Sequence, residues 1–148
     1  MGQKTADPAV DAWKAILGLV GWGKGSGPRF PMVALELDLS PKQLGVIWRL
    51  DPDGPGTPMR AIAQSLFCDA SYVTDLVDRL EERGLIVRTQ DPGDRRVKLL
   101  KLTPEGIALR AKALEKLYEP PAGFEQLTVD EQRTLARLLE KIDADGAE

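Results

Sequence analysis

The stretch that decides the fold is residues 70–106, ASYVTDLVDRLEERGLIVRTQDPGDRRVKLLKLTPEG. Its first part carries apolar residues three and four positions apart, at Val73, Leu76, Val77 and Leu80. This spacing places them on one face of a helix predicted over 70–83, and Gly84 is a natural residue for its end. Two β-rich runs, 85–89 and 97–102, then flank a turn that contains Pro-Gly. The pattern predicts a helix followed by a β-hairpin.

Two further helices are predicted immediately before this stretch. Ser40-Pro41-Lys42-Gln43 combines an N-cap serine, a proline at the first helical position and a glutamine that can bond back, which predicts a helix over 41–50. Thr57-Pro58 repeats this signature and predicts a helix over 58–67. Asp69 is a candidate N-cap for the helix that follows. Helix, helix, turn, helix and hairpin is the order of a winged helix-turn-helix, here over 41–102.

The segments on either side of this lobe are predicted to be helical. Apolar spacing predicts helices over 8–20 and 30–39. After the lobe, Thr103-Pro104-Glu105 begins a predicted helix over 104–118, and a capping box at Thr128 to Glu131 begins one that runs to about Ile142. We therefore expect a mainly α (α+β) fold, with the whole chain, 1–148, forming a single domain.

Cations gather around the predicted hairpin, although the chain as a whole is acidic. The formal net charge is −3, yet residues 79–101 hold seven basic and four acidic residues. The predicted tight turn at Asp91 to Asp94 leads directly into Arg95 and Arg96. An exposed basic hairpin can simply be a solubilising edge. Directly after a helix-turn-helix pattern, it favours contact with double-stranded DNA, because binding depends on local rather than net charge.

Composition excludes several kinds of site. The chain has no histidine, and Cys68 is its one cysteine, so His-based triads, an intrachain disulfide and zinc sites of ordinary composition are excluded. We expect Cys68 to be a small core residue, and we expect no catalytic residue, metal or cofactor, hence no enzyme. No apolar run approaches the ~20 residues that span a bilayer, and the N-terminus lacks a signal-peptide pattern. No membrane association and a cytoplasmic location are therefore expected.

The candidate DNA-reading residues lie on the outer face of the helix over 70–83. Short hydroxyl side chains there suit contacts with phosphates and base edges, and they belong to Ser71, Tyr72 and Thr74. Arg79, one turn later, can reach a phosphate. Asp75 and Asp78 leave two interpretations open, because each can accept from a cytosine amino group or act as a spacer that faces solvent.

The sequence from Met59 to Gly106 resembles the MarR family of bacterial and archaeal regulators. The family pattern S-x-V-T-x-L-V-D-R-L-E-x-x-G-L is matched by residues 71–85, SYVTDLVDRLEERGL. The D-x-R motif of the family's wing falls on 94–96, and the L-T-x-x-G that ends its second strand falls on 102–106. These motifs keep the family's order and spacing over about a third of the chain.

The resemblance implies a homodimer of winged-helix subunits that binds pseudo-palindromic operators and usually represses transcription. The segments 8–39 and 103–145 would be the dimerisation helices. At the wing tip, the resemblance implies that Arg96 enters the minor groove and that Asp94 holds it through a charge-assisted hydrogen bond. Arg95 occupies the variable middle position of the motif, so we expect it to contact a phosphate at most. Lys98, on the return strand, adds to the wing's positive charge.

Many members of the family release DNA when they bind a small aromatic or phenolic effector. Candidates for such an effector pocket are the large aromatic residues Trp22, Phe30 and Trp48, since apolar walls with few polar groups suit these ligands. Packing in the core or in a dimer interface is the alternative for them. The lobe also has a second interpretation, as a winged-helix module that binds another protein and not DNA, because a fold does not fix a function.

Overall fold

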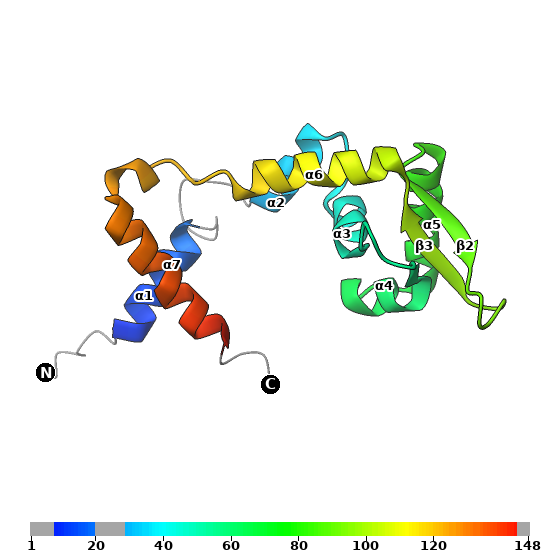
Figure 1. Ribbon diagram of the computed structural model, residues 1–148, viewed down its shortest axis with the longest axis horizontal. Helices are drawn as coiled ribbons and strands as arrows, with labels where there is room; N and C mark the ends of the chain where they lie inside the picture. Colours follow the sequence, from blue (N-terminus) through cyan, green and yellow to red (C-terminus); the bar gives the residue numbers. More distant parts are fainter. Residues whose placement is uncertain (1–7, 20–28, 145–148) are drawn as a thin grey trace, which may run out of the picture. The chain divides into compact units, whose positions relative to one another are not determined.

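The computed structural model describes residues 8–19 and 29–144, which divide into two compact units on either side of the Tyr118–Glu119 bond. The first unit contains the strands β1 (Thr57–Pro58), β2 (Ile86–Gln90) and β3 (Lys98–Leu102) and the helices α1 (Pro8–Leu19), α2 (Arg29–Glu36), α3 (Pro41–Arg49), α4 (Met59–Leu66), α5 (Ala70–Glu82) and α6 (Pro104–Tyr118) (Figure 1). The second contains a 3₁₀ turn, η1 (Phe124–Gln126), and α7 (Val129–Ala144). The predicted mainly α fold with a small sheet is confirmed.

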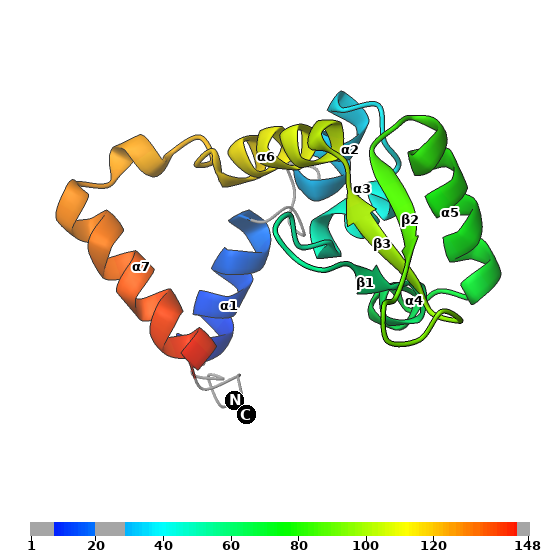
Figure 2. The same cartoon turned by 45° about the vertical axis from the view of Figure 1, so that its right-hand side comes forward.

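The winged helix-turn-helix is formed by α3, α4 and α5, followed by the β2–β3 hairpin (Figure 2). The sheet has the strand order β1-β3-β2 and is antiparallel throughout. Ile86 lies opposite Leu102, and Gln90 lies opposite Lys98, so the hairpin opens into a loop after residue 90. This order of elements is the one that the sequence predicts.

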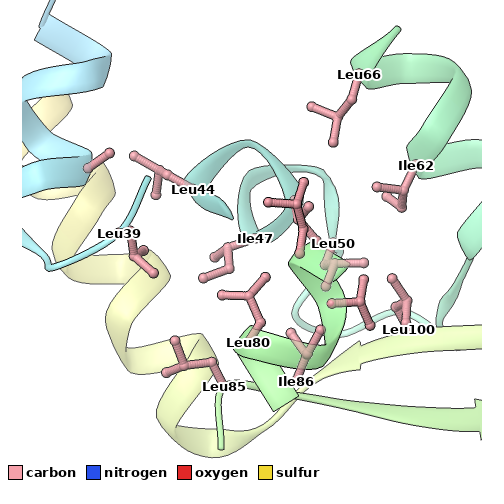
Figure 3. Packing of buried hydrophobic residues seen from close by; sticks show 14 of the residues in the cluster. Leu39, Leu44, Ile47, Leu50, Ile62, Leu66, Leu80, Leu85, Ile86 and Leu100 are labelled. Atoms are coloured by element: carbon pink, nitrogen blue, oxygen red, sulfur yellow. The ribbon is translucent and has the colours of Figure 1, made fainter. Parts of the chain in front are cut away.

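The core of the first unit lies where α3, α4, α5 and the hairpin meet (Figure 3). Its largest fully buried side chains come from all of these elements and include Leu44, Ile47, Leu50, Ile62, Leu80, Ile86 and Leu100. The predicted apolar face of α5 is part of this core, since Val73, Leu76, Val77 and Leu80 are all buried. Burial of such side chains stabilises the fold by about 1.5–3 kcal/mol each. It also leaves the opposite face of α5 exposed.

Two predicted capping boxes are present. Before α3, the Gln43 backbone amide donates to Ser40 Oγ at 3.1 Å, and the Ser40 amide donates to Gln43 Oε1 at 2.8 Å. Before α7, the Thr128 amide donates to Glu131 Oε2 at 2.8 Å, and the Glu131 amide donates to Thr128 Oγ1 at 3.3 Å. Each pair satisfies backbone donors that the first turn of a helix leaves free.

The predicted cap at Thr57 is wrong. Thr57 lies in the short strand β1, opposite Leu100 of β3, and α4 begins only at Met59. Pro58 precedes the helix and makes no side-chain cap, because proline carries no acceptor on its ring. Asp69 does occupy the N-cap position of α5 with an extended backbone, but its side chain makes no capping hydrogen bond. The pairing of β1 with β3 accounts for the first difference, because it holds Thr57 in an extended strand.

Apolar side chains stay exposed on α1 and on α7. In the second unit, the exposed residues of α7 include Leu138, Leu139 and Ile142, the last of them 67% exposed. On α1, Val10 and Trp13 are 44% and 58% exposed. These residues lie on the faces that the sequence assigns to packing. Among the described residues, no helix is both long enough and apolar enough to cross a membrane.

Candidate nucleic-acid interface

The outer face of α5 presents the residues predicted to read DNA. Exposed on it are Ser71, Tyr72, Thr74, Asp75 and Arg79. Thr74 Oγ1 donates to the Ala70 carbonyl at 2.9 Å, so its hydroxyl proton is engaged while lone pairs on the oxygen can still accept. Tyr72 is 46% exposed and offers a phenolic hydroxyl that can donate and accept. The helix therefore offers donors and acceptors along one exposed face.

An ion cluster connects α5 to the hairpin. The Arg88 guanidinium of β2 bonds to the carboxylates of both Asp78 and Glu81, and the Arg88 backbone amide donates to Glu81 Oε1 at 3.3 Å. The Arg88 side chain is only 24% exposed. Asp78 faces solvent, as one of the two sequence interpretations expects, since its side chain is 50% exposed, and it is also paired with Arg88. The cluster thus joins strand β2 of the wing directly to α5.

The wing loop spans residues 91–97 and is longer than the predicted tight turn. The Asp91 backbone amide donates to the Val97 carbonyl at 3.1 Å and closes the loop. A turn closed by a backbone hydrogen bond lies at 94–97, where the Val97 amide donates to the Asp94 carbonyl at 2.9 Å. Within the predicted turn at 91–94 the chain bends at Pro92 and Gly93, and the Gly93 amide donates to Asp91 Oδ1 at 2.7 Å. Arg95 and Arg96 are the two central residues of the second turn, at 94–97.

Asp94 and Arg96 are joined by three hydrogen bonds. Asp94 Oδ1 accepts from the Arg96 backbone amide at 3.0 Å and from Arg96 Nε at 3.2 Å, and Asp94 Oδ2 accepts from Arg96 Nη2 at 3.4 Å. The guanidinium of Arg96 and, after it, the Arg96 amide hold the pKa of Asp94 below its ordinary value. The Arg96 side chain is still 90% exposed. An arginine oriented in this way can meet an anionic surface with less conformational freedom left to lose.

Three further cations surround this pair and α5. Arg79, Arg95 and Lys98 are all exposed, and no ion pair is found for them among residues 8–19 and 29–144. In both views of the ribbon, the wing loop and the turn between α4 and α5 lie at the same end of the lobe, where α5 begins (Figures 1 and 2). The first turns of α5 and the wing tip can therefore face one and the same surface.

Two of the three predicted effector-pocket residues are in contact. The rings of Phe30 and Trp48 pack edge to face, with centroids 6.1 Å apart and planes at 82°. Arg110 of α6 lies over Trp48, 5.8 Å from the ring centroid, and its Nε is buried without a partner among the described residues. Trp22 lies outside the described residues. The effector pocket thus stays a prediction, and a cation lies over one of its two described aromatic rings.

Two residues of this region are not expected from the sequence. In the sequence, Arg88 is only one of the cations around the hairpin. Its pairing with two carboxylates of α5 becomes visible only when the hairpin is folded. Phe67, at the end of α4, has a left-handed backbone with φ 51° and is 97% exposed. Its one sequence signal is the presence of a bulky residue where a helix ends, a position that usually favours glycine.

Comparison with protein families and curated proteins gives consistent matches. The model described as "MarR family" matches residues 39–98. The multiple antibiotic resistance protein MarR of Salmonella typhimurium is 34% identical over 112 residues, which cover 72% of this chain and 74% of that protein. A putative transcriptional regulatory protein for the hcr operon of Thauera aromatica is 34% identical over 91 residues. That match covers 61% of this chain and about half of the Thauera protein, 55%.

Solved structures match over nearly the whole chain. YusO of Bacillus subtilis has a TM-score of 0.68 and 28% identity, and the match covers 95% of this chain and 99% of YusO. The transcriptional repressor CouR bound to a 23-mer DNA duplex has a TM-score of 0.58 and 29% identity, with coverage of 97% and 96%. CouR from Rhodococcus jostii RHA1 bound to p-coumaroyl-CoA has a TM-score of 0.60 and 28% identity, with coverage of 95% of each chain.

Proposed function

This chain belongs to the MarR family of transcriptional regulators, and from that premise we propose that it is a homodimeric repressor of pseudo-palindromic DNA operators. The observation that carries the proposal is the pair formed by Asp94 and Arg96 at the tip of an exposed wing, at the same end of the lobe as the start of α5. The protein-binding alternative does not require a braced arginine at this tip. CouR, which matches nearly the whole chain, is described as bound to a DNA duplex.

In the proposed complex, α5 enters the major groove with its first turns foremost. Ser71, Tyr72 and Thr74 contact base edges and phosphates, and Arg79 contacts a phosphate one turn later. Asp75 is exposed on the same face, where its carboxylate can accept from a cytosine amino group. The hydroxyl groups contribute to the sequence preference, because contacts with base edges distinguish one base pair from another whereas contacts with phosphates do not.

The wing supplies a second contact, in the flanking minor groove. A narrow minor groove has a strongly negative potential, which attracts an arginine side chain. Arg96 enters the groove, while Asp94 restricts its rotamers and so lowers the entropy cost of binding. Arg95 and Lys98 contact phosphates and make the affinity dependent on salt concentration.

Dimerisation places two such lobes on one operator. Two-fold symmetry requires two α5 helices about 34 Å apart, one turn of the DNA, which matches an inverted-repeat operator. Exposed apolar residues of α1 and α7, such as Trp13 and Ile142, are the surfaces we assign to the partner chain. In this proposal the segments 8–39 and 103–145 belong with the lobe to a single domain, 1–148.

We further propose that a small aromatic or phenolic effector releases the DNA. CouR is described as bound to p-coumaroyl-CoA, a molecule with a phenolic group. In this chain, Phe30 and Trp48 offer aromatic walls, with Trp22 as the third candidate. An effector acts only if it prefers a dimer shape in which the two α5 helices are wrongly spaced for the operator. The regulator would act in the cytoplasm, where the DNA is, and would perform no chemistry.

Selection from a pool of random DNA duplexes tests the proposal. We expect the purified protein to enrich an inverted repeat and to bind it more weakly as salt concentration rises. Arg96→Ala should enrich poorly under the same conditions. A pool that shows no enriched sequence with the parent protein would reject DNA recognition and favour the protein-binding alternative.

A further inference from the structure

Phe67 combines two unfavourable features at the end of α4. Its φ of 51° and ψ of 45° lie in the left-handed region, where a side chain with a Cβ is disfavoured and a bulky residue is an outlier. Glycine adopts this conformation without cost, which is why it usually occupies such a position. The Phe67 phenyl ring is also 97% exposed.

The backbone around Phe67 explains how this conformation is held. The Phe67 amide donates to the Gln64 carbonyl at 3.1 Å, and the Cys68 amide donates to the Ala63 carbonyl at 3.1 Å. These bonds close α4 and start the short connection to Asp69, the N-cap of α5. The tight turn thus fixes the backbone, and the ring gains almost nothing from its own chain. Strained residues of this kind concentrate at binding sites, where a partner supplies the missing contacts.

The surroundings of the ring indicate what the partner is. Phe67 borders an open hollow of ≈ 640 Å³ between α4 and α5, with Met59, Ala63 and Val73 among its apolar lining. Arg60 and Thr74 also line it. Thr74 lies on the face of α5 that we assign to DNA, so the hollow and the ring continue that face. A partner here must offer an apolar group beside an anionic or hydrogen-bonding surface.

We propose that Phe67 is a specificity-determining residue that contacts the C5-methyl group of a thymine when α5 lies in the major groove. This inference rests on the proposed function, because it requires that α5 bind there. The thymine methyl is the one apolar group on the major-groove edges of the four bases, and phenylalanine is among the residues that contact it. Phosphates next to the same base lie within the range of a cation such as Arg60.

The left-handed backbone has a clear role in this arrangement. A phenylalanine within α4 would project along the helix surface, whereas at this position the side chain leaves the end of the helix beside the first residues of α5. The strain at Phe67 is therefore the cost of placing an apolar side chain next to Thr74 on the DNA-reading face. Relief of that strain should stabilise the free protein and weaken its preference for thymine.

The test combines substitutions of Phe67 with operators in which single thymines are replaced by deoxyuridine, which lacks only the C5-methyl group. The operator is the inverted repeat enriched by the parent protein. For the parent, we expect one symmetric pair of replacements to weaken binding by about 3- to 15-fold, and the other replacements to have little effect. Phe67→Ala should bind the unmodified operator about tenfold more weakly and should not respond to the sensitive replacement.

Two further variants separate the ring from the fold. Phe67→Leu keeps an apolar side chain and should retain part of the response to deoxyuridine. Phe67→Gly should raise Tm by about 2–4 °C and still lose the response, since glycine fits the left-handed backbone. These opposite effects on Tm and affinity are not expected of a residue that matters only for folding.

The outcomes distinguish this inference from the proposal on which it rests. If the parent protein enriches no operator, the proposed function fails, and the contact fails with it. If the parent binds its operator and Phe67→Ala binds equally well, only the thymine contact is wrong. A loss in Phe67→Ala that is the same whichever thymines are replaced would also overturn it, because the ring would then contact the backbone or a second protein.

Discussion

Arg96 and Asp94 are hydrogen-bonded to each other at the tip of the wing, although both side chains are open to solvent. Three bonds of 3.0–3.4 Å join them, and one of these uses the Arg96 backbone amide. The bond to the Arg96 backbone amide orients the Asp94 carboxylate, and this carboxylate orients the guanidinium. The pair is therefore a preformed element and does not depend on DNA to assemble it.

Replacement of Asp94 should weaken DNA binding without loss of the fold. Asp94→Asn keeps an acceptor for the Arg96 amide but removes the charge that holds the guanidinium, so we expect about a three- to tenfold weaker affinity. Tm should stay close to that of the parent because both groups are exposed. Fluorescence anisotropy and thermal melts measure the two effects, and a fall in Tm equal to that of a core variant would contradict this account.

Titration of Asp94 should affect DNA binding only at acidic pH. The folded-state pKa of Asp94 is lowered by the hydrogen bonds from Arg96, so the brace is fully present above the ordinary aspartate pKa of about 4. It is lost as pH falls through the lowered folded value. We expect the ratio of parent to Asp94→Asn affinities to stay constant between about pH 5 and 8 and to shrink below pH 4. A ratio that changes near neutral pH would point to another group.

The link between α5 and the wing should contribute to stability. Arg88→Ala removes the bonds to Asp78 and Glu81 and leaves two carboxylates close together, so we expect a free energy of unfolding lower by about 1–2 kcal/mol. Arg79→Ala is the matched control, since this exposed arginine has no ion pair within the described part of the chain, and it should change stability by less than about 0.5 kcal/mol. Equal effects in chemical denaturation would show that the cluster is incidental.

Sequence alone predicts the parts of the fold that depend on near neighbours. The capping box of Ser40 and Gln43 and the start of α6 at Pro104 are confirmed, because their signals lie within a few residues. Strand β1 is not predicted, since Thr57 pairs with Leu100, far along the chain, and carries no local strand signal.

In the candidate site, too, contacts between residues close in sequence are predictable and contacts between distant residues are not. Asp94 and Arg96 are two residues apart, so a motif can encode their contact. Asp78 and Arg88 meet only because the hairpin folds back beside α5, and the sequence does not reveal that geometry. The left-handed conformation of Phe67 is the least predictable, since a phenylalanine in the sequence gives no reason to expect the backbone of a glycine.

Two glycines should differ sharply in their tolerance of alanine. A Cβ on Gly106 would lie 1.9 Å from the Leu85 carbonyl oxygen, which is backbone and cannot turn aside. Gly106→Ala should therefore cost about 3 kcal/mol or more. Gly84 has a φ of 70°, but a Cβ added to it would meet no atom within 4 Å, so Gly84→Ala should cost only about 1–2 kcal/mol, from backbone strain. Urea denaturation distinguishes the two, and equal costs would contradict the close packing of α6 on the β2 connection.

The apolar face of α7 should be required for dimerisation. Leu139→Glu places a charge on this face and should convert a dimer into a species with the 16.2 kDa mass of one chain. Arg137→Glu introduces the same side chain at an exposed position on the opposite face of α7 and should leave the dimer intact. Sedimentation at micromolar concentration measures both. A parent protein that is already monomeric would contradict the dimer, as would equal dissociation of the two variants.

The most direct test of the account compares Arg96→Ala with Arg95→Ala on the operator enriched by the parent protein. The two arginines are adjacent in one turn, but only Arg96 is held by Asp94. We expect Arg96→Ala to bind at least about tenfold more weakly and to lose its preference for A·T pairs at the flanks of the operator. Arg95→Ala should lose less affinity for the operator, and its main effect should be a weaker dependence of the affinity on salt concentration. Equal losses, or a greater loss for Arg95→Ala, would contradict the role assigned to the Asp94–Arg96 pair.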